Sequence, residues 1–223
     1  MQRIIIIGNS LSAEVLYGYI KDDKRYSIEA FSVDKDYIKE KKFCNIDLVD
    51  LSDLNKRYSP KDFNVIIGMG YKNLNRNRER VFKRIKELGF KIETYINPNA
   101  SIHNDRAIGE GSIIFSNSVI EPYSMIGQNT VVWANCTIAH HSKIGDNCWV
   151  ASGAVVSGEA IVKNNCFLGV NVTVSNKVII EPFNIIGANT CIQKCTKENE
   201  VYLSRNGEKH RFTASEYAEH CLI

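Results

Sequence analysis

The 223-residue sequence has no apolar run that approaches membrane-spanning length, so a transmembrane helix is not expected. Its first residues do not combine a basic flank, an apolar stretch and a cleavage site, because the run from Ile4 to Ile7 is only as long as a strand. The formal charge of +3 is close to balance, and the basic residues do not cluster with interleaved aromatics. We therefore expect a cytoplasmic protein that neither inserts into a membrane nor binds nucleic acid.

The sequence also lacks the cysteine spacing of a metal site. It contains 7 cysteines but no Cys-x-x-Cys pair with a matching set of histidines, so no metal is expected. Without a secretion signal, reduced thiols are favoured over a disulfide framework. Cys136, Cys148 and Cys166 occupy small, inward positions of the repeat described next, and the last two lie one coil apart.

A six-residue period dominates the second half of the chain. Every sixth residue from Ile102 to Ile192 is Ile, Val or Leu, which gives sixteen hexads without an insertion. This period matches neither a helix nor an alternating strand and is typical of a parallel β-helix, whose aliphatic side chains point down the axis. Residues two before the aliphatic ones are mostly small. They include Ser112, Ser118, Ser124, Thr130, Cys136, Ser142, Cys148, Ala154 and Ala160.

The glycines support a triangular coil made of three hexads, in which stacked residues are 18 positions apart. Gly109, Gly127 and Gly145 have this spacing, as do Gly169 and Gly187. Each follows an aliphatic residue, and we expect the backbone to bend there in a conformation that glycine adopts easily. A β-sandwich with a coincidental period is the alternative, but sandwiches have irregular turn lengths.

Residues 1–97 have the pattern of a small Rossmann-like α/β domain. Strands are predicted over 3–7, 64–67 and 91–96, and helices over 13–20 and 77–88. Pro98 marks the boundary to the β-helix, which is predicted over 98–195.

Ligands of such α/β domains bind beyond the carboxyl ends of the strands, where loop amides can meet phosphate. The candidate residues are Gly8, Asn9, Ser10, Ser12, Gly68 and Gly70, with Asp34 after the second expected strand. Gly8 to Ser12 is not a G-x-G-x-x-G motif, so a nicotinamide dinucleotide is disfavoured. Gly8 and Gly68 are equally explained as turn glycines, and Asp34 as a surface acid.

Two histidines stand out within the hexads. His140 and His141 follow Ile138 by two and three residues, where a corner directs side chains away from the packed axis. A histidine there can accept a proton near neutral pH.

The Gly8-Asn9-Ser10 turn, the strand leading to Pro98, and the hexads with Ile-x-His140-x-x-x-Ile-Gly-Asp146 together resemble a known family. They are similar to the bacterial sugar acetyltransferases of the sialic acid O-acetyltransferase family. That family includes N-acetyltransferases of nucleotide-linked 4-amino-4,6-dideoxy sugars. The resemblance covers residues 2–195.

The resemblance implies a left-handed β-helix and a homotrimer, with acetyl-CoA bound between adjacent β-helices. It also implies that the amino-terminal domain holds a UDP- or dTDP-linked amino sugar. The product would serve the synthesis of a surface glycan, either lipopolysaccharide or capsule.

The resemblance also implies roles for individual residues. His140 matches the catalytic base, and His141 stands where relatives often have an acid that orients it. Gly8 to Ser12 match the turn that approaches the nucleotide sugar, although relatives commonly have His in place of Ser12. Trp149 stands where many relatives have a second His near the thioester. The remaining positions along the CoA arm are Gly158 and Ala188, with Gly153, Gly169 and Gly187 as neighbours.

The family's terminal Gly-x-Pro-Ala-Lys element is missing. Residues 196–223 are instead predicted to form a cap, with a hairpin over 201–212 around Asn206-Gly207 and a short helix. The hairpin would cover the open end of the β-helix, which otherwise presents an unpaired edge. A contact with CoA is the alternative role.

The expected reaction is direct acetyl transfer from acetyl-CoA to a sugar amine. His140 would accept a proton while a backbone N–H stabilises the oxyanion, and no cysteine has an activating partner that would indicate an acyl-enzyme. An O-acetyltransferase acting on a sugar hydroxyl is an alternative. A carbonic anhydrase needs three separated histidines on zinc, which His103, His140 and His141 do not supply. A sugar-binding β-helix is the non-enzyme alternative.

Overall fold

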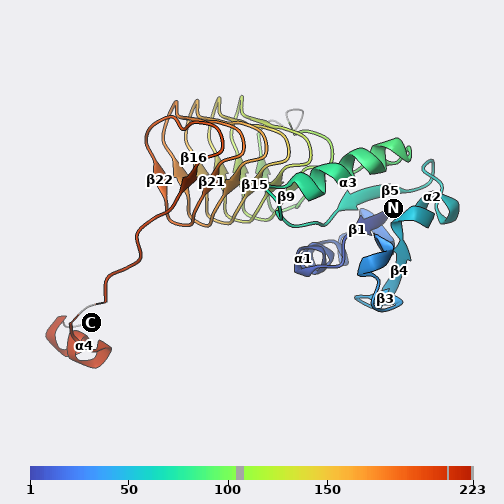
Figure 1. Ribbon diagram of the computed structural model, residues 1–223, viewed down its shortest axis with the longest axis horizontal. Coiled ribbons are helices and arrows are strands. Elements are labelled where there is room, and N and C mark those ends of the chain that lie inside the picture. Colours follow the sequence, from blue (N-terminus) through green and yellow to red (C-terminus); the bar gives the residue numbers. More distant parts are fainter. Residues whose placement is uncertain (104–107, 210, 222–223) are drawn as a thin grey trace.

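The computed structural model describes residues 1–103, 108–209 and 211–221. It consists of an amino-terminal α/β unit, a β-helix and a carboxyl-terminal helix (Figure 1). The α/β unit lies at one end of the β-helix, and the carboxyl-terminal helix lies beyond the other end. Among the described residues, no helix is both long and apolar enough to cross a membrane.

The α/β unit is built on a six-stranded sheet with the order β3-β4-β2-β1-β5-β6. Its neighbouring strands are parallel except for β3 and β4. The strands are β1 (Gln2–Ile7), β2 (Tyr26–Val33), β3 (Lys42–Phe43), β4 (Ile46–Asp50), β5 (Asn64–Ile67) and β6 (Lys91–Ile92). The helices are α1 (Leu11–Ile20), η1 (Lys35–Tyr37), η2 (Leu51–Asp53), α2 (Leu54–Arg57) and α3 (Arg76–Glu87). The four isoleucines of β1 are buried, as expected for a central strand covered on both faces.

The strand predicted over 91–96 is two strands. Lys91–Ile92 extends the α/β sheet by pairing with β5, whereas β7 (Tyr95–Ile96) pairs with the β-helix strand β9. The hydroxyl of Thr94 turns the chain between them, since it donates to the carbonyl of Gly109 and accepts from the N–H of Gly111, each at 3.1 Å. Strand pairing of the β-helix therefore starts at Tyr95.

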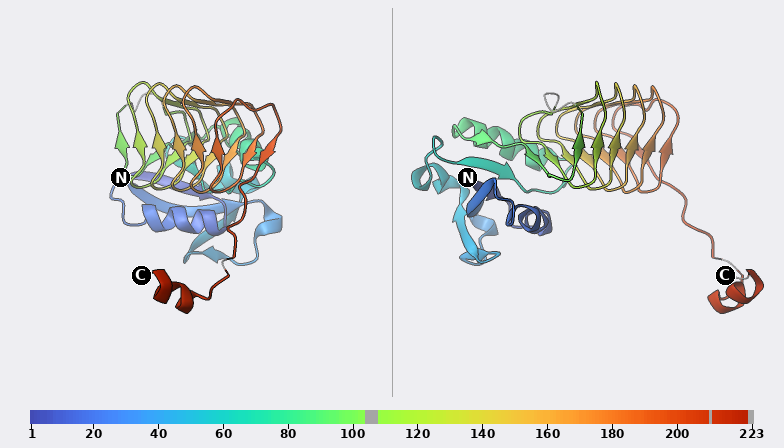
Figure 2. Two further views of the ribbon diagram at one scale, coloured as in Figure 1. Left: turned by 90° about the vertical axis from the view of Figure 1, so that its left-hand side faces the viewer. Right: turned by 180° about the vertical axis from the view of Figure 1, so that it is seen from behind.

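The β-helix consists of two-residue strands arranged in three parallel walls. The walls have the orders β22-β19-β16-β13-β10-β8, β11-β14-β17-β20 and β23-β21-β18-β15-β12-β9-β7. Their strands are β8 (Ser101–Ile102), β9 (Ile113–Ile114), β10 (Val119–Ile120), β11 (Met125–Ile126), β12 (Val131–Val132), β13 (Thr137–Ile138), β14 (Lys143–Ile144), β15 (Trp149–Val150), β16 (Val155–Val156), β17 (Ile161–Val162), β18 (Phe167–Leu168), β19 (Thr173–Val174), β20 (Ile179–Ile180), β21 (Ile185–Ile186), β22 (Cys191–Ile192) and β23 (Val201–Tyr202). Figure 2 shows these strands stacked in register.

The pairing confirms a parallel β-helix with three hexads to a coil. Ile120, Ile138 and Val156 are paired in succession, each 18 residues from the next, and all are fully buried. Cys136, which lies two residues before Ile138, is also fully buried. The hexad pattern therefore predicts both the strand positions and the core.

The reason predicted for the glycines is wrong. None of the five glycines that follow an aliphatic residue has a left-handed φ. That conformation falls two residues later, where Asn is the commonest residue, as in Asn129 and Asn147. The requirement at Gly127 is steric, because a Cβ there would lie 2.6 Å from the carbonyl carbon of Gly145 and 2.3 Å from Oδ1 of Asp146. That oxygen accepts the N–H of Gln128 at 2.9 Å. Glycine thus allows close stacking of the coils.

The α/β unit and the β-helix share a hydrophobic cluster. Phe31 of β2 belongs to the same buried cluster as Ile113, Phe115 and Trp149 of the β-helix. Arg78 of α3 is fully buried at this junction, where its Nη2 donates to the carbonyls of Cys148 and Asn129 at 2.9 and 3.1 Å. Burial lowers the pKa of Arg78 to about 10. Apolar and polar contacts together fix the α/β unit on the β-helix.

The predicted carboxyl-terminal hairpin is also wrong. Val201–Tyr202 pairs in parallel with β21, and residues 203–209 contain no strand. Parallel pairing extends the existing wall directly, whereas the Asn206-Gly207 turn has no strand on either side. A short helix is present as α4 (Ala214–Cys221), but Figure 1 shows it away from the β-helix, so it does not cover the open end.

The steric role of Gly127 is tested by Gly127→Ala, with Gly18→Ala as the matched control. Gly127→Ala should lower the free energy of unfolding by about 1–3 kcal/mol, because the new methyl group overpacks adjacent coils. A Cβ on Gly18, inside α1, would meet nothing within 4 Å, so Gly18→Ala should raise stability by about 0.5–1 kcal/mol. Urea denaturation measures both. Equal effects of the two substitutions would contradict the steric explanation.

Candidate active site

The predicted substrate-binding glycines converge at the carboxyl edge of the α/β sheet. Gly8 follows β1 and Gly68 follows β5, and a Cβ on Gly8 would lie 3.1 Å from the carbonyl oxygen of Gly68. A Cβ on Gly70 would lie 3.3 Å from the hydroxyl of Ser12. Gly8 has a φ of 124°, which side-chain-bearing residues rarely adopt. Gly8 and Gly68 are buried and Gly70 is partly exposed, so these glycines allow the two loops to pack closely against each other.

The polar residues of this edge differ in their partners. Asn9 Nδ2 donates to the carbonyl of Tyr37 at 2.9 Å, which ties the first loop to the segment after β2. Ser10 is exposed at the N-cap of α1 and makes no capping hydrogen bond with its side chain. Asp34 forms an ion pair with Arg84 of α3. The structure thus brings all seven predicted residues to neighbouring loops, with Asp34 already engaged.

His140 and His141 lie in the corner between β13 and β14, and both are exposed. Their Nδ1 atoms are 3.2 Å apart, which is hydrogen-bonding distance. The backbone N–H of His140 donates to Oε2 of Glu121 at 2.7 Å. His141 has a φ of 59°, and its ring packs against Tyr123 of the preceding coil with the centroids 4.8 Å apart. The two imidazole rings are therefore paired through their Nδ1 atoms, and the ring of His141 is supported by Tyr123.

Gly158 lies one coil beyond His140 and leaves space for its ring. A Cβ at Gly158 would be 2.6 Å from Cε1 and 2.8 Å from Nε2 of His140. The N–H of Glu159 donates to the carbonyl of His140 at 3.0 Å and fixes the coil spacing at this point. The direct contact made by Gly158 is thus with the histidine.

Three of the six predicted CoA residues, Trp149, Gly169 and Ala188, line a single open groove of about 370 Å³. The other lining residues are Tyr71, Trp133, Ala151, Ser152, Phe167 and Val170. Trp149 is only 5% exposed, because rings of Tyr71 and Trp133 pack on it with centroids 5.1 and 5.4 Å away. We call this feature the aromatic groove.

The other predicted CoA residues lie outside this lining. Gly187 is adjacent to Ala188 and is covered by Leu203, whose Cδ2 would be 2.7 Å from a Cβ on the glycine. Gly153 has a φ of 74°, so its local role is to make a left-handed turn. Gly158 lies beside His140, as described above.

Within one chain, the aromatic groove and the histidine pair lie at different corners of the β-helix. Ala151, Ser152 and Gly169 follow strands of the β7-to-β23 wall, whereas His140 and His141 follow β13 on the next wall. One wall of the β-helix separates the two corners. A reaction centre that used both features would have to span this wall or combine two copies of the chain.

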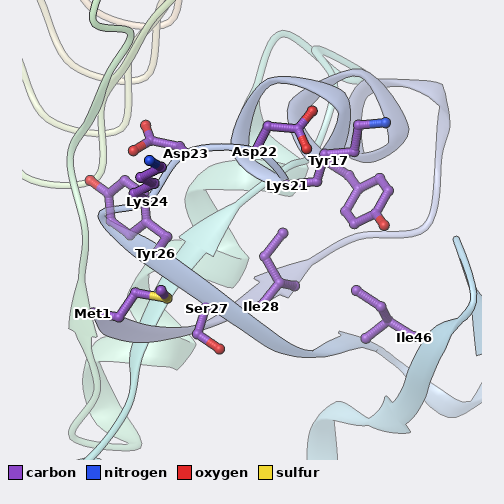
Figure 3. Close-up of a pocket in the computed structure, with 10 residues that line it drawn as sticks. All are labelled: Met1, Tyr17, Lys21, Asp22, Asp23, Lys24, Tyr26, Ser27, Ile28 and Ile46. Carbon is purple, nitrogen blue, oxygen red and sulfur yellow. The ribbon is translucent and has the colours of Figure 1, made fainter.

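A second open cavity of about 340 Å³ lies near the end of α1 and the start of β2. Figure 3 shows its lining, in which the charged residues from Lys21 to Lys24 lie on one side and Met1, Ser27 and Ile46 lie on the other. It contains none of the predicted site residues. Charges of both signs border it, and it is built at the opposite edge of the sheet from Gly8 and Gly68.

Sequence reasoning missed Tyr123, Glu121 and Tyr71. Tyr123 lies 18 residues before His141, so the coil length was a usable signal for it. Glu121 lies 19 residues before His140, so the 18-residue coil length does not by itself place it beside the histidine. Tyr71 lies outside the repeat, and no pattern in the sequence relates it to Trp149 or Phe167.

The described residues include no group of three or more His, Cys, Asp and Glu side chains placed to hold a metal ion. Cys136, Cys148 and Cys166 are buried, whereas Cys191 and Cys195 are exposed. Burial raises the pKa of Cys136 to about 11. Burial also raises the pKa of Cys148, whereas the hydrogen bond with Cys148 lowers the pKa of Cys166. The burial of all three thiols in the coils favours a structural role.

Residues 123–158 match the family model of the bacterial transferase hexapeptide with six repeats. The acetyltransferase domain of PglB from Neisseria gonorrhoeae FA1090 has a similar structure, with a TM-score of 0.80 and 19% identity over 90% of this chain and 96% of that one. PerB from Caulobacter crescentus, in complex with CoA and GDP-perosamine, has a TM-score of 0.79 and 20% identity over 90% and 93%. WeeI from Acinetobacter baumannii AYE has a TM-score of 0.69 and 15% identity over 90% and 96%.

No curated protein matches the chain in sequence. The solved structures show that the chain has the hexapeptide-repeat, left-handed β-helix fold joined to an amino-terminal α/β unit. This shared fold extends over 90% of the chain in both comparisons.

The structural role of the buried thiols is tested by alkylation. Iodoacetamide at pH 8 should modify Cys191 and Cys195 in the native protein and leave Cys136, Cys148 and Cys166 unmodified, because burial blocks access of the reagent to all three. Burial also disfavours the thiolate of Cys136 and Cys148 by raising the pKa of each. Peptide mass spectrometry measures each site. All five should react in denaturant. Modification of native Cys136 as fast as Cys191 would show that the coil is more open than described.

Proposed function

We propose that the protein is an acetyl-CoA-dependent N-acetyltransferase that acts on a nucleotide-linked amino sugar. The observation that carries the proposal is the His140–His141 pair, exposed on a β-helix corner with Gly158 leaving space beside the His140 ring. The similar PglB domain was solved with acetyl coenzyme A, and PerB with CoA and GDP-perosamine. The loops around Gly8 and Gly68 would hold the nucleotide sugar.

The geometry of the histidine pair supports a general base at Nε2 of His140. Two Nδ1 atoms form a hydrogen bond only when one is protonated and the other is not. When His140 carries that proton, its Nε2 has a free lone pair and His141 Nδ1 is the acceptor. His141 thus fixes the tautomer of His140, as an orienting acid does in other sites. The ring of Tyr123 supports His141 in this arrangement.

Proton transfer balances in a direct reaction. The neutral sugar amine attacks the thioester carbonyl, and its N–H proton passes to Nε2 of His140. When the C–S bond breaks, the protonated His140 returns that proton to the departing CoA thiolate. A backbone N–H of a neighbouring coil would stabilise the oxyanion. No protein thiol takes part.

The separation of the two corners supports an active site shared between subunits. The aromatic groove of one copy would face the His140 corner of the next, and three such interfaces close a ring. A homotrimer is therefore part of the proposal. The α/β unit would present the amino sugar at the same interface.

The identity of the nucleotide is a further part of the proposal. The family resemblance implies UDP or dTDP, while the PerB complex contains GDP-perosamine. Turnover with a panel of UDP-, dTDP- and GDP-linked 4-amino-4,6-dideoxy sugars identifies the nucleobase of the substrate. The matching sugars with a hydroxyl in place of the amine test O-acetylation with the same assay.

His140→Asn should reduce turnover by about 10²- to 10⁴-fold, because it removes the base. CoA binding should persist, since His140 lies outside the aromatic groove. His141→Ala should have a smaller effect, because it removes only the group that fixes the tautomer. Steady-state kinetics with a CoA-thiol assay and calorimetry measure both properties. Near-normal turnover of His140→Asn would exclude His140 as the base, and a larger effect at His141 would reverse the assignment.

A shared site is tested by mixing two inactive variants. His140→Asn lacks the base, and Ala188→Trp fills the aromatic groove. Random mixed trimers should recover about a quarter of wild-type activity, because some interfaces pair an intact histidine with an intact groove. The control mixes His140→Asn with His140→Ala and should recover none. Sedimentation should report a trimer throughout. Absence of recovery in folded mixed trimers would place the whole site within one chain.

A further inference from the structure

Tyr71 is the one described residue of the α/β unit that lines the aromatic groove. Its ring packs on Phe167 and Trp149 with centroids 4.7 and 5.1 Å away. The residue is nevertheless 51% exposed, so a large part of the ring remains available to a ligand. Tyr71 therefore forms an outer wall of the groove and is not only a buried packing residue.

A strained turn holds Tyr71 in this position. Asn73, Leu74 and Asn75 are consecutive left-handed residues, with φ values of 55°, 49° and 62°. The N–H of Asn75 donates to the carbonyl of Tyr71 at 3.1 Å and closes the turn. Left-handed residues other than glycine cost free energy and persist where surrounding contacts impose them.

The contacts that impose the turn come from the β-helix. Asn75 is fully buried, and its Nδ2 donates to the carbonyl of Cys166 at 3.3 Å. Asn165 donates from its Nδ2 to the carbonyl of Leu74 at 3.3 Å. The turn is thus attached to the same coils that supply Trp149 and Phe167, and Tyr71 has a defined place over them.

The lining of the groove indicates the part of the ligand that it accepts. Its residues are aromatic or small, and none carries a charge. Val170, at 47% exposure, leaves an apolar surface open to solvent. An uncharged, flexible arm such as the pantetheine of coenzyme A fits this lining, since its methylene groups pack on aromatic faces. A diphosphate would find no cation among these side chains.

The same short segment reaches the other predicted site. Gly68 and Gly70 lie at the carboxyl edge of the sheet, where Gly68 faces Gly8 and Gly70 faces Ser12. Tyr71 is the next residue. A nucleotide sugar that contacts Gly70 would therefore act on the residue next to the wall of the groove, and the reverse would hold for a ligand in the groove.

We propose that Tyr71 is a binding residue for the pantetheine arm of coenzyme A and that the segment from Gly68 to Tyr71 couples occupancy of the two ligand sites. This inference rests on the proposed function, because it takes coenzyme A and a nucleotide sugar as the two ligands. Coupling of this kind is reciprocal, so each ligand changes the affinity of the other by the same factor.

The test measures the Kd of CoA by calorimetry, alone and with saturating UDP, dTDP or GDP. Tyr71→Ala should raise the Kd of CoA by about three- to tenfold, as expected for loss of one aromatic contact. Tyr71→Phe should bind as wild type does. Tyr37→Ala is the matched control, because Tyr37 is an exposed tyrosine of the same unit outside the groove, and its Kd for CoA should be unchanged.

The coupling is read from the same titrations. In the wild type, the nucleoside diphosphate that binds should change the Kd of CoA by about threefold or more. In Tyr71→Ala the change should vanish, while the Kd of that nucleotide alone stays within about twofold of wild type. If Tyr71→Ala lowers the thermal unfolding temperature, Tyr71→Leu replaces it, since Leu still covers Trp149.

The outcomes separate this inference from the proposed function. Failure of the wild type to bind CoA would overturn the proposed function. Wild-type binding with an unchanged Kd in Tyr71→Ala would overturn the role of Tyr71 alone. Coupling that persists in Tyr71→Ala, or is absent from the wild type, would overturn the link between the two sites.

Discussion

The close stacking of coils is the constraint on which the rest of the structure depends. Each residue of the β-helix lies over the residue one coil away, so a position in the sequence fixes a column in space. In the column through His140, this constraint demands glycine at 158, because any Cβ would enter the imidazole ring. In the next column it places Tyr123 against His141. The coil stacking that builds the core therefore also sets the backbone position of the candidate catalytic corner.

The junction between the two units follows a different rule. No repeat aligns α3 with the β-helix, so the alignment depends on individual side chains. Arg78 supplies donors to two β-helix carbonyls. Asn75 donates to the carbonyl of Cys166, and Asn165 donates to the carbonyl of Leu74. A buried polar contact is costly when one partner is displaced. These contacts therefore specify one orientation of the α/β unit on the β-helix, whereas an apolar cluster alone would tolerate several orientations. That specificity brings the Gly68–Tyr71 segment to a fixed place between the two candidate ligand sites.

The sequence predicts the parts of the fold that repeat, and the reasons lie in the period itself. The hexads locate the strands, the core and the coil length, and the carboxyl-edge rule brings Gly8 and Gly68 together. Features that depend on contacts outside the period were not predictable in this way. The glycine spacing reveals a close approach but not a torsion angle, so its cause was misassigned. The hydrogen bond from Thr94 to the later residue Gly109 divides one predicted strand into two. The Asn206-Gly207 pair predicts a hairpin locally, but β23 pairs in parallel with β21 instead. Tyr71 meets Trp149 only through tertiary structure.

The arrangement also suggests why a rigid β-helix and a mobile pair of substrates are compatible. A direct acyl transfer needs two ligands held together with a base, but the β-helix corners cannot move to enclose them. The loops at the carboxyl edge of the α/β sheet lie outside the repeat, and Gly70 is partly exposed there whereas Gly8 and Gly68 are buried. Under the proposed coupling, a change that a ligand makes at Gly70 would reach the groove through Tyr71, the next residue. The β-helix corner would then supply the base, and the Gly68–Tyr71 segment would link occupancy of the two ligand sites.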